Sequence, residues 1–165
     1  MSKNWYPLYT KSRFEKKALD SLKKEGYEAY LPLQKQIRQW SDRKKSVEVP
    51  LFSSYVFVRI EKHEVRDVLK VNGVVSYIYF NNQPATVRDE EIELLKSLLN
   101  TNTEMSVIEN KLSAGTPVKI TNGILAGYSG KVYQLKNSAQ ISIEIENMNK
   151  TLLVTIDSSF ILPLM

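Results

Sequence analysis

The strongest strand pattern in the first hundred residues is Pro50-Leu51-Phe52-Ser53-Ser54-Tyr55-Val56-Phe57-Val58. Successive side chains of a strand point to opposite faces of a sheet, so Tyr55 and Phe57 share one face while the two valines share the other. If helices cover the valine face, the two rings lie on the opposite surface with Tyr9, in an apolar patch of the kind that binds partners. If instead the rings form the core, the valines point outward, and the alternation does not choose between these two arrangements.

A helix is predicted to precede this segment. Ser12 stands three residues before Glu15, the spacing of a capping box that pairs two free amide groups at a helix start. Gly26 supplies a stop signal at the C-terminal end. Between them, apolar residues recur on one face of an otherwise charged segment, at Phe14, Ala18, Leu19 and Leu22.

The rest of the first hundred residues alternates between strand and helix patterns. Residues 34–49 are a polar arm whose alternating flanks predict an extended hairpin around residues 41–44. The last helix begins at the acidic turn 89–91 and is predicted to bury Ile92, Leu95 and Leu99. The other predicted elements are strands at 5–9, 27–33, 51–60, 74–80 and 84–87 and a short helix at 62–70. This order is compatible with a split-βαβ sandwich of one sheet and one helical layer.

A polar segment separates this half from a second, all-β half. Residues 101–113 are predicted to be a linker, because they show little periodicity. Strand patterns follow at 117–121, 129–135, 140–146, 151–156 and 159–162. Five short strands in so few residues predict a small SH3-like barrel, in which closure of the sheet hides its edges. We therefore expect an α+β protein with domains at 1–100 and 114–165.

Composition and charge limit the class of protein. The 165 residues are 42% hydrophobic and 25% charged, which is typical of a folded globular chain. No apolar segment could cross a bilayer or act as a secretory leader, so we expect a cytoplasmic protein without a membrane partner. The net charge of +5 lies entirely within residues 1–100, which suggests a polyanion near that half.

Catalytic chemistry has few candidate residues. The chain has no cysteine, and its one histidine, His63, is predicted to be exposed on a short helix. Ser21 and Lys24 match a Ser-x-x-Lys spacing, but they lie within a helix and have no companion motif. The glycine run near residue 123 lacks the first glycine of a phosphate-binding loop, since Leu125 stands there. We expect no enzyme, no cofactor and no metal site.

The second half carries a specific glycine pattern. Its first part reads Gly115-Thr116-Pro117-Val118-Lys119-Ile120-Thr121-Asn122-Gly123, and Gly127 and Gly130-Lys131-Val132 follow. This spacing resembles the KOW motif, although Thr116 replaces its usual acidic residue. Upstream, Trp5-Tyr6 and residues 50–58 resemble the N-terminal domain of the NusG family of transcription elongation and antitermination factors. Ser53 and Ser54 stand where that family usually has Pro and Gly or Asn. The resemblance covers nearly the whole chain, with the domains in the same order.

The resemblance implies particular roles. In the NusG family, the N-terminal domain docks on the clamp helices of RNA polymerase and suppresses pausing or termination. Residue by residue, it assigns this docking surface to Tyr9, Phe52, Tyr55 and Phe57. Lys11 and Arg13 match basic positions that approach the non-template DNA strand. Residues 64–66 replace a polar stretch that contacts the opposite polymerase subunit in specialised members, so that contact is not expected.

The KOW domain of the family recruits a small ribosomal subunit protein or Rho. Residues 38–50 are most similar to specialised (UpxY-like) paralogues that antiterminate polysaccharide operons. Some specialised relatives hold this domain as a helical hairpin, but its β-branched residues and its glycines at 123, 127 and 130 favour a permanent barrel. We expect a monomer. The alternative, a ribosome-associated RNA-binding KOW protein, leaves residues 1–100 unexplained.

Overall fold

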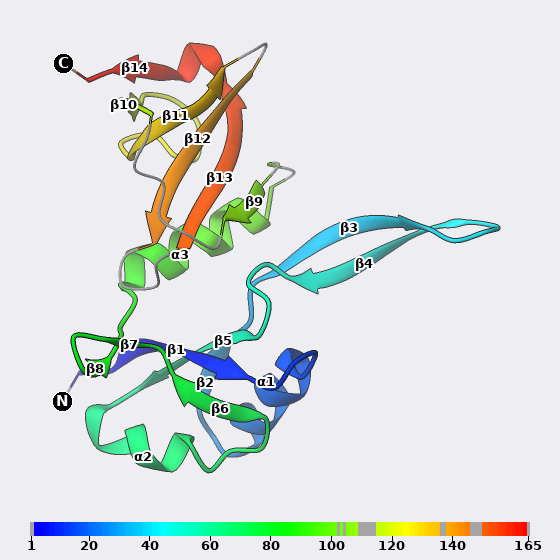
Figure 1. Ribbon diagram of the computed structural model, residues 1–165, viewed down its shortest axis with the longest axis vertical. Helices are drawn as coiled ribbons and strands as arrows, with labels where there is room; N and C mark the ends of the chain where they lie inside the picture. The colour runs from blue at the N-terminus through cyan, green and yellow to red at the C-terminus, as the bar shows by residue number, and fades with distance from the viewer. Residues whose placement is uncertain are drawn as a thin grey trace. The chain divides into compact units, whose positions relative to one another are not determined.

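The computed structural model describes residues 2–101, 103, 105–108, 115–135, 138–145 and 150–164. The chain forms two compact units, Met1–Asp89 and Glu90–Met165, and its elements are labelled in Figure 1. The division falls ahead of the boundary predicted at residue 100, because nearly all of α3 (Asp89–Leu99) is grouped with the second unit. Helices and strands are mixed in the chain, as the sequence predicts.

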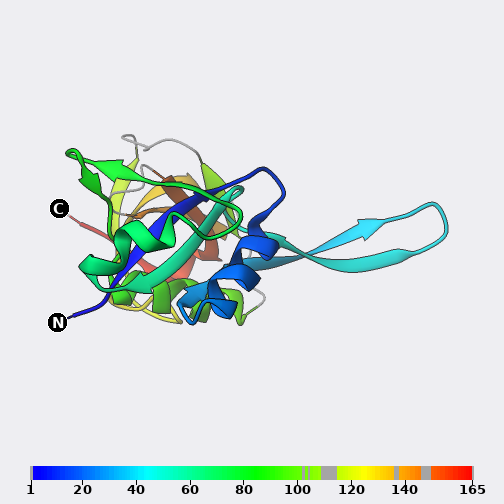
Figure 2. The ribbon, with the colours of Figure 1, turned by 90° about the horizontal axis from the view of Figure 1, so that it is seen from below.

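The first unit contains a four-stranded sheet with the strand order β2-β5-β1-β6, in which all neighbouring strands are antiparallel. α1 connects β1 to β2, and η1 and α2 connect β5 to β6 (Figures 1 and 2). Two hairpins, β3–β4 and β7–β8, complete the unit. The bounds are β1 (Asn4–Thr10), α1 (Glu15–Lys24), β2 (Glu28–Tyr30), β3 (Leu33–Gln39), β4 (Lys44–Pro50), β5 (Tyr55–Ile60), η1 (Lys62–Glu64), α2 (Val65–Val68), β6 (Val74–Tyr77), β7 (Tyr79–Phe80) and β8 (Gln83–Pro84).

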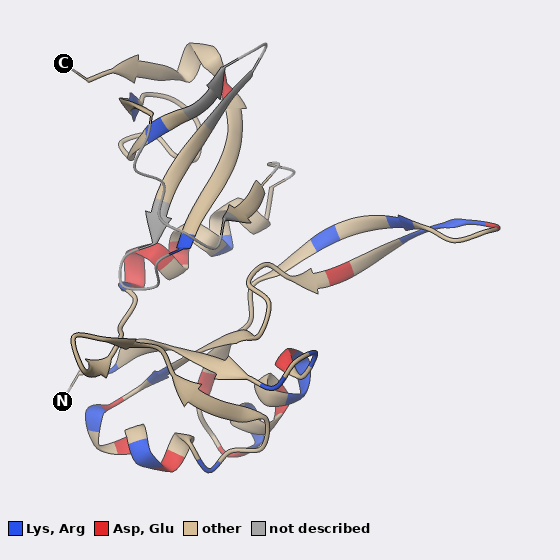
Figure 3. Cartoon of the chain, viewed as in Figure 1, with Lys and Arg blue, Asp and Glu red and all other residues tan. Residues whose placement is uncertain are grey.

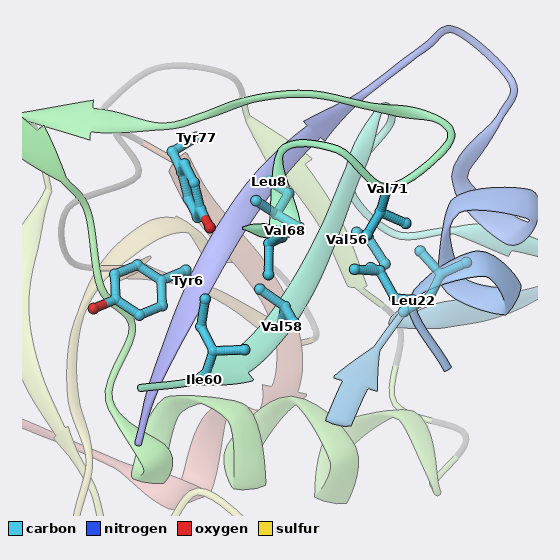
Figure 4. Close-up of a cluster of buried hydrophobic side chains, with 10 residues drawn as sticks. Tyr6, Leu8, Leu22, Val56, Val58, Ile60, Val68, Val71 and Tyr77 are labelled. Carbon is cyan, nitrogen blue, oxygen red and sulfur yellow. The ribbon is translucent and has the colours of Figure 1, made fainter. Parts of the chain in front are cut away.

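The core of the first unit lies between this sheet and its helices (Figure 4). Val56 and Val58 of β5 pack here with Leu22 of α1 and Val68 of α2, and all four are fully buried. Each such side chain stabilises the fold by about 1.5–3 kcal/mol. The helices therefore cover the valine face of β5, which decides between the two arrangements that the alternation left open.

A buried tyrosine closes one end of the core. The Tyr77 hydroxyl donates a hydrogen bond of 2.7 Å to the carbonyl oxygen of Val65. Its ring meets Tyr6 edge to face, with 5.7 Å between the centroids. Burial raises the pKa of Tyr77 above its ordinary value, because the phenolate would lose its solvation. The hydrogen bond thus gives a partner to the buried Tyr77 hydroxyl, which stays protonated.

The predicted capping box of α1 is wrong. The helix begins at Glu15 with Phe14 as its N-cap, and no side chain caps it. A tight turn displaces the helix start from Ser12, because Phe14 N–H donates to Lys11 O over 3.0 Å and Arg13 has a φ of 58°. The predicted stop at Gly26 is confirmed by a left-handed φ of 89°.

The second unit is a six-stranded antiparallel sheet with the order β14-β10-β11-β12-β13-β9. Its strands are β9 (Met105–Ile108), β10 (Thr116–Ile120), β11 (Ser129–Leu135), β12 (Ser138–Ile145), β13 (Lys150–Asp157) and β14 (Ile161–Pro163), with η2 (Ser158–Phe160) before the last. Four of the five predicted strands are confirmed in their described residues, with residue 146 of the strand predicted at 140–146 outside them. The fifth, predicted at 159–162, begins only at Ile161, because residues 158–160 form η2. Strands rather than a helical hairpin therefore form this half among its described residues.

Two predictions for the second unit need correction. Residues 105–108 of the predicted linker form β9, which pairs with β13 and buries Met105; residues 102, 104 and 109–113 lie outside the described residues. In α3, Ile92 and Leu95 are buried as predicted, but Leu99 is not, and the helix buries Leu94 and Leu98 instead. In the described part of the chain, no helix is long and apolar enough to cross a membrane.

Candidate functional site

Four aromatic side chains predicted from the sequence lie together in the first unit, and we call Tyr9, Phe52, Tyr55 and Phe57 the aromatic cluster. The antiparallel register of β1 and β5 places Tyr9 directly opposite Tyr55. Their rings stack with 4.8 Å between centroids and 29° between planes. The Tyr55 hydroxyl donates a hydrogen bond of 3.0 Å to the Tyr9 hydroxyl. Strand pairing therefore joins two side chains that are 46 residues apart in the sequence.

The turn before β5 brings Phe52 into the aromatic cluster. The Phe52 ring meets Tyr55 and Phe57 edge to face, with centroids 6.5 and 6.1 Å apart. Ser54 has a φ of 64°, and its carbonyl accepts a hydrogen bond of 2.9 Å from Thr10 N–H. Glycine and asparagine adopt this left-handed conformation more readily than serine. Ser54 therefore adopts the left-handed conformation of this turn, although the family that the sequence resembles usually has glycine or asparagine at this position.

The exposure of the aromatic cluster differs from the sequence prediction. Tyr9 is 41% exposed, but Phe52, Tyr55 and Phe57 are only 2, 4 and 0% exposed. The expectation of a surface patch is thus correct for Tyr9 and wrong for the other three rings. Burial, together with the hydrogen bond to Tyr9, raises the pKa of Tyr55 above the ordinary tyrosine value. The cluster is therefore a packed, un-ionised group with one accessible ring.

Lys11 and Arg13 lie in the turn between β1 and α1, directly after the strand that carries Tyr9. Both side chains are exposed. The Lys11 backbone N–H donates 3.0 Å to Gly73 O, which ties this turn to the start of β6. The ammonium groups of Lys11 and Lys17 lie 5.7 and 4.9 Å from the centroid of the Phe14 ring, within the range of cation–π attraction. The turn thus presents a small group of cations around one ring.

The predicted KOW glycines surround β10 and the turn that leads to β11. Gly115, Gly123 and Gly127 all have left-handed φ values. Gly130 has no left-handed φ, but a Cβ on it would lie 2.7 Å from a backbone oxygen of β12, that of Ser142. Here glycine permits the close approach of two strands. The structure therefore gives a steric reason for these residue types, as the motif predicts.

Other candidate sites carry no catalytic arrangement in the described residues. His63 is exposed, and its Nδ1 lies 3.3 Å from an oxygen of Glu61. Among the described residues, no group of three or more His, Cys, Asp or Glu side chains could hold a metal ion. Two exposed aromatic residues, Tyr79 and Phe80, lie on the β7–β8 hairpin outside the aromatic cluster.

Comparison with known proteins agrees with these features. The chain is 23% identical over 162 residues to the transcription termination/antitermination protein NusG of Pseudomonas aeruginosa, which covers 88% of this chain and 90% of that protein. It is also 23% identical over 150 residues to NusG of Halalkalibacterium halodurans, covering 82% and 84%.

A solved structure of Thermotoga maritima NusG has the same fold, with a TM-score of 0.64 at 20% identity over 99% of this chain and 98% of that one. The family model described as transcription termination factor NusG matches residues 3–96, which is more than half of the sequence. This chain therefore belongs to the NusG family.

Proposed function

We propose that this chain is a transcription elongation and antitermination factor that docks on the clamp helices of RNA polymerase and suppresses pausing or termination. The observation that carries the proposal is the aromatic cluster, in which β1, β5 and the turn before β5 bring all four expected docking residues into contact. Large aromatic side chains are the residues most often found as anchors of protein interfaces. Relatives of similar length are named as termination and antitermination proteins, which supports the same process.

The burial of the aromatic cluster gives the docking step a physical requirement. Tyr9 can meet a partner directly, because 41% of it is exposed. Phe52, Tyr55 and Phe57 are buried, so polymerase contact with them requires a rearrangement that exposes their ring edges. We therefore assign the first contact to Tyr9, with the other rings contributing as they become accessible.

Lys11 and Arg13 would follow the non-template DNA strand of the transcription bubble. They are exposed and lie directly after β1, so a polymerase bound at Tyr9 places its DNA within reach of the same turn. Phosphate groups attract such cations in a salt-dependent manner. Figure 3 shows Lys and Arg concentrated on the turns, helices and hairpin of the first unit.

The second unit would recruit a partner, either a small ribosomal subunit protein or Rho. Ile124 and Tyr128 in the glycine-rich turn are exposed apolar residues, and Leu125 beside them lines a surface hollow together with Phe160. Exposed apolar groups of this kind favour protein contacts. The strand orders support a split-βαβ first domain and an SH3-like barrel as the second. The proposed factor would act as a monomer in the cytoplasm.

Co-purification tests the proposal. The full chain carrying an affinity tag should retain core RNA polymerase at low salt, and ribosomes should bind only through the second unit. A Tyr9→Ala chain should lose polymerase and keep its second-unit partner. Retention of ribosomes without polymerase by the parent chain would contradict the proposal and favour the ribosome-associated RNA-binding protein instead.

A further inference from the structure

The β3–β4 hairpin has a surface composition that polymerase docking does not explain. It extends away from the four-stranded sheet of its own unit (Figure 2), and all side chains from Lys35 to Ser46 are exposed. Residues 33–50 contain five basic and two acidic residues, a net charge of +3 out of the +5 of the whole chain. Yet Ile37 and Trp40 within it are 76% and 54% exposed. A large exposed ring on a basic hairpin needs an explanation other than solubility.

The register of the hairpin sorts these residues onto two faces. Gln39 pairs with Lys44, Arg38 with Lys45 and Ile37 with Ser46, and directly paired residues share a face. Trp40 N–H donates 2.7 Å to Arg43 O, which continues the pairing into the turn. One face therefore carries Arg38, Trp40, Arg43 and Lys45, whereas the other carries Lys35, Ile37, Gln39, Lys44, Ser46 and Glu48.

The first of these faces has the character of an unoccupied anion site. Arg38 and Lys45 are like charges placed directly opposite each other, an arrangement that destabilises a strand pair. Among the described residues, no carboxylate forms an ion pair with Arg38, Arg43 or Lys45. On the second face, by contrast, Lys35 lies opposite Glu48. The face that bears the exposed tryptophan thus carries three positive charges (Arg38, Arg43 and Lys45) and no carboxylate, whereas the other face carries two positive charges (Lys35 and Lys44) and the carboxylate of Glu48.

We propose that this face, Arg38, Trp40, Arg43 and Lys45, binds single-stranded DNA, with the basic residues on the phosphates and Trp40 stacked on an unpaired base. Proteins that hold single strands combine cations along the backbone with aromatic rings on which bases stack. Duplex DNA would engage the cations but has no unpaired base for the ring. The inference rests on the proposed function in one respect: at a polymerase, the available single strand is the non-template strand.

The hairpin is held to the rest of the first unit at its base. Leu51 N–H donates 2.9 Å to Pro32 O, which closes the two strands beside the sheet. The Lys16 ammonium of α1 donates 3.0 Å to Glu48 O of β4. Lys16 belongs to the helix that follows the turn of Lys11 and Arg13. The hairpin and that basic turn are thus attached to the same helix.

Binding of a fluorescent thymidine oligonucleotide to the full-length chain without polymerase tests the inference. Trp40→Ala should weaken binding about 5- to 100-fold, as expected for the loss of one stacked base. Ile37→Ala, which removes an even more exposed apolar side chain from the other face, should leave binding unchanged. Equal binding by the parent and Trp40→Ala chains, or equal losses from both variants, would overturn the proposal.

Charge removal gives a second, independent measurement. Arg38→Gln with Lys45→Gln should make the log–log salt dependence of binding shallower by about 1.4, since each phosphate contact to a single strand contributes about 0.7. Lys35→Gln with Lys44→Gln removes the same charge from the opposite face and should change the slope less. Equal slopes for the two pairs would refute the assignment to this face.

The tryptophans themselves provide a spectroscopic check. Trp5 is buried and Trp40 is exposed, and the chain has no other tryptophan. Stacking of a base on Trp40 should therefore quench the tryptophan fluorescence of the parent chain but not that of Trp40→Phe. Tighter binding to an RNA oligomer or to a duplex than to the DNA strand would overturn the choice of ligand. Co-purification of polymerase with Trp40→Ala separates the two hypotheses, because that variant should still bind polymerase if the proposed function is correct.

Discussion

Tyr9→Ala is the substitution that best separates docking from folding. Tyr9 is 41% exposed, whereas Phe57 of the same cluster is fully buried. A loss of polymerase binding by a Phe57→Ala chain would be ambiguous, because removing a fully buried ring also destabilises the fold. The same loss by Tyr9→Ala would report on the contact itself, provided that its structural cost is small.

That cost follows from the geometry of the aromatic cluster. Tyr9→Ala removes one stacked ring pair, worth about 0.5–1.5 kcal/mol. It also removes one hydrogen bond, with a net contribution of about 0.5–1.5 kcal/mol. The expected loss in the free energy of unfolding is therefore about 1–3 kcal/mol. Phe57→Ala should cost about 3–5 kcal/mol, a large share of the roughly 5–15 kcal/mol that stabilises a typical small domain.

Two measurements on the full-length chain test both numbers. Urea denaturation gives the stability change, and a binding titration with core RNA polymerase gives the dissociation constant. An interface anchor contributes about 2–4 kcal/mol, so Tyr9→Ala should weaken polymerase binding about 30- to 1,000-fold. Tyr79→Ala is the matched control, since its ring is 59% exposed but lies on the β7–β8 hairpin outside the cluster.

Two results would refute this reasoning. A folded Tyr9→Ala chain that binds polymerase as tightly as the parent would exclude Tyr9 from the docking surface. A Phe57→Ala chain no less stable than Tyr9→Ala would show that the burial of Phe57 does not contribute to the fold as assumed.

Three further predictions address other parts of the chain. Gly130→Ala should lower the stability of the second unit by about 1–3 kcal/mol, since its Cβ would lie 2.7 Å from a backbone oxygen. Gly127→Ala is the control that isolates the cost of a left-handed φ, because its Cβ would meet no atom within 4 Å. Thermal denaturation of both variants measures the difference. Lys11→Gln with Arg13→Gln should weaken recruitment to a transcription bubble but not to DNA-free polymerase, and added salt should shrink the difference. The raised pKa of Tyr77 keeps its proton bound in the folded state. The folded state should therefore lose stability as the pH rises above about 10, where the tyrosine of the unfolded chain ionises. An unchanged urea midpoint between pH 9 and 11 would contradict this prediction.

The periodicity of a strand predicts which of its side chains lie on the same face. The alternation of β5 places Val56 and Val58 on one face and Tyr55 and Phe57 on the other, but it does not show which face α1 covers. The same alternation could not show that the opposite face is also buried. Whether a face of a strand is buried depends on the elements that pack against it, and the periodicity of one strand does not identify these elements.

The missed elements have similar physical causes. Ser12 and Glu15 have the spacing of a capping box, yet the backbone turn that puts Arg13 at a φ of 58° delays the helix until Glu15. The sequence predicts a linker where β9 forms, because four residues are too few to show a strand periodicity. Its strand conformation depends on hydrogen bonds to β13, about 45 residues later in the chain.

The aromatic cluster and α1 lie on opposite sides of the sheet of the first unit. The side chains of Leu8, Val56 and Val58 point toward α1, so Tyr9, Tyr55 and Phe57, which alternate with them, point to the other side. Lys11 and Arg13 precede α1 and the β3–β4 hairpin is bonded to it through Lys16. If a protein partner on the aromatic cluster leaves the hairpin accessible to DNA, Tyr9→Ala and the hairpin substitutions act at separate sites, and their effects on the free energy of recruitment should add. A combined effect that differs from the sum would show that the two contacts are coupled.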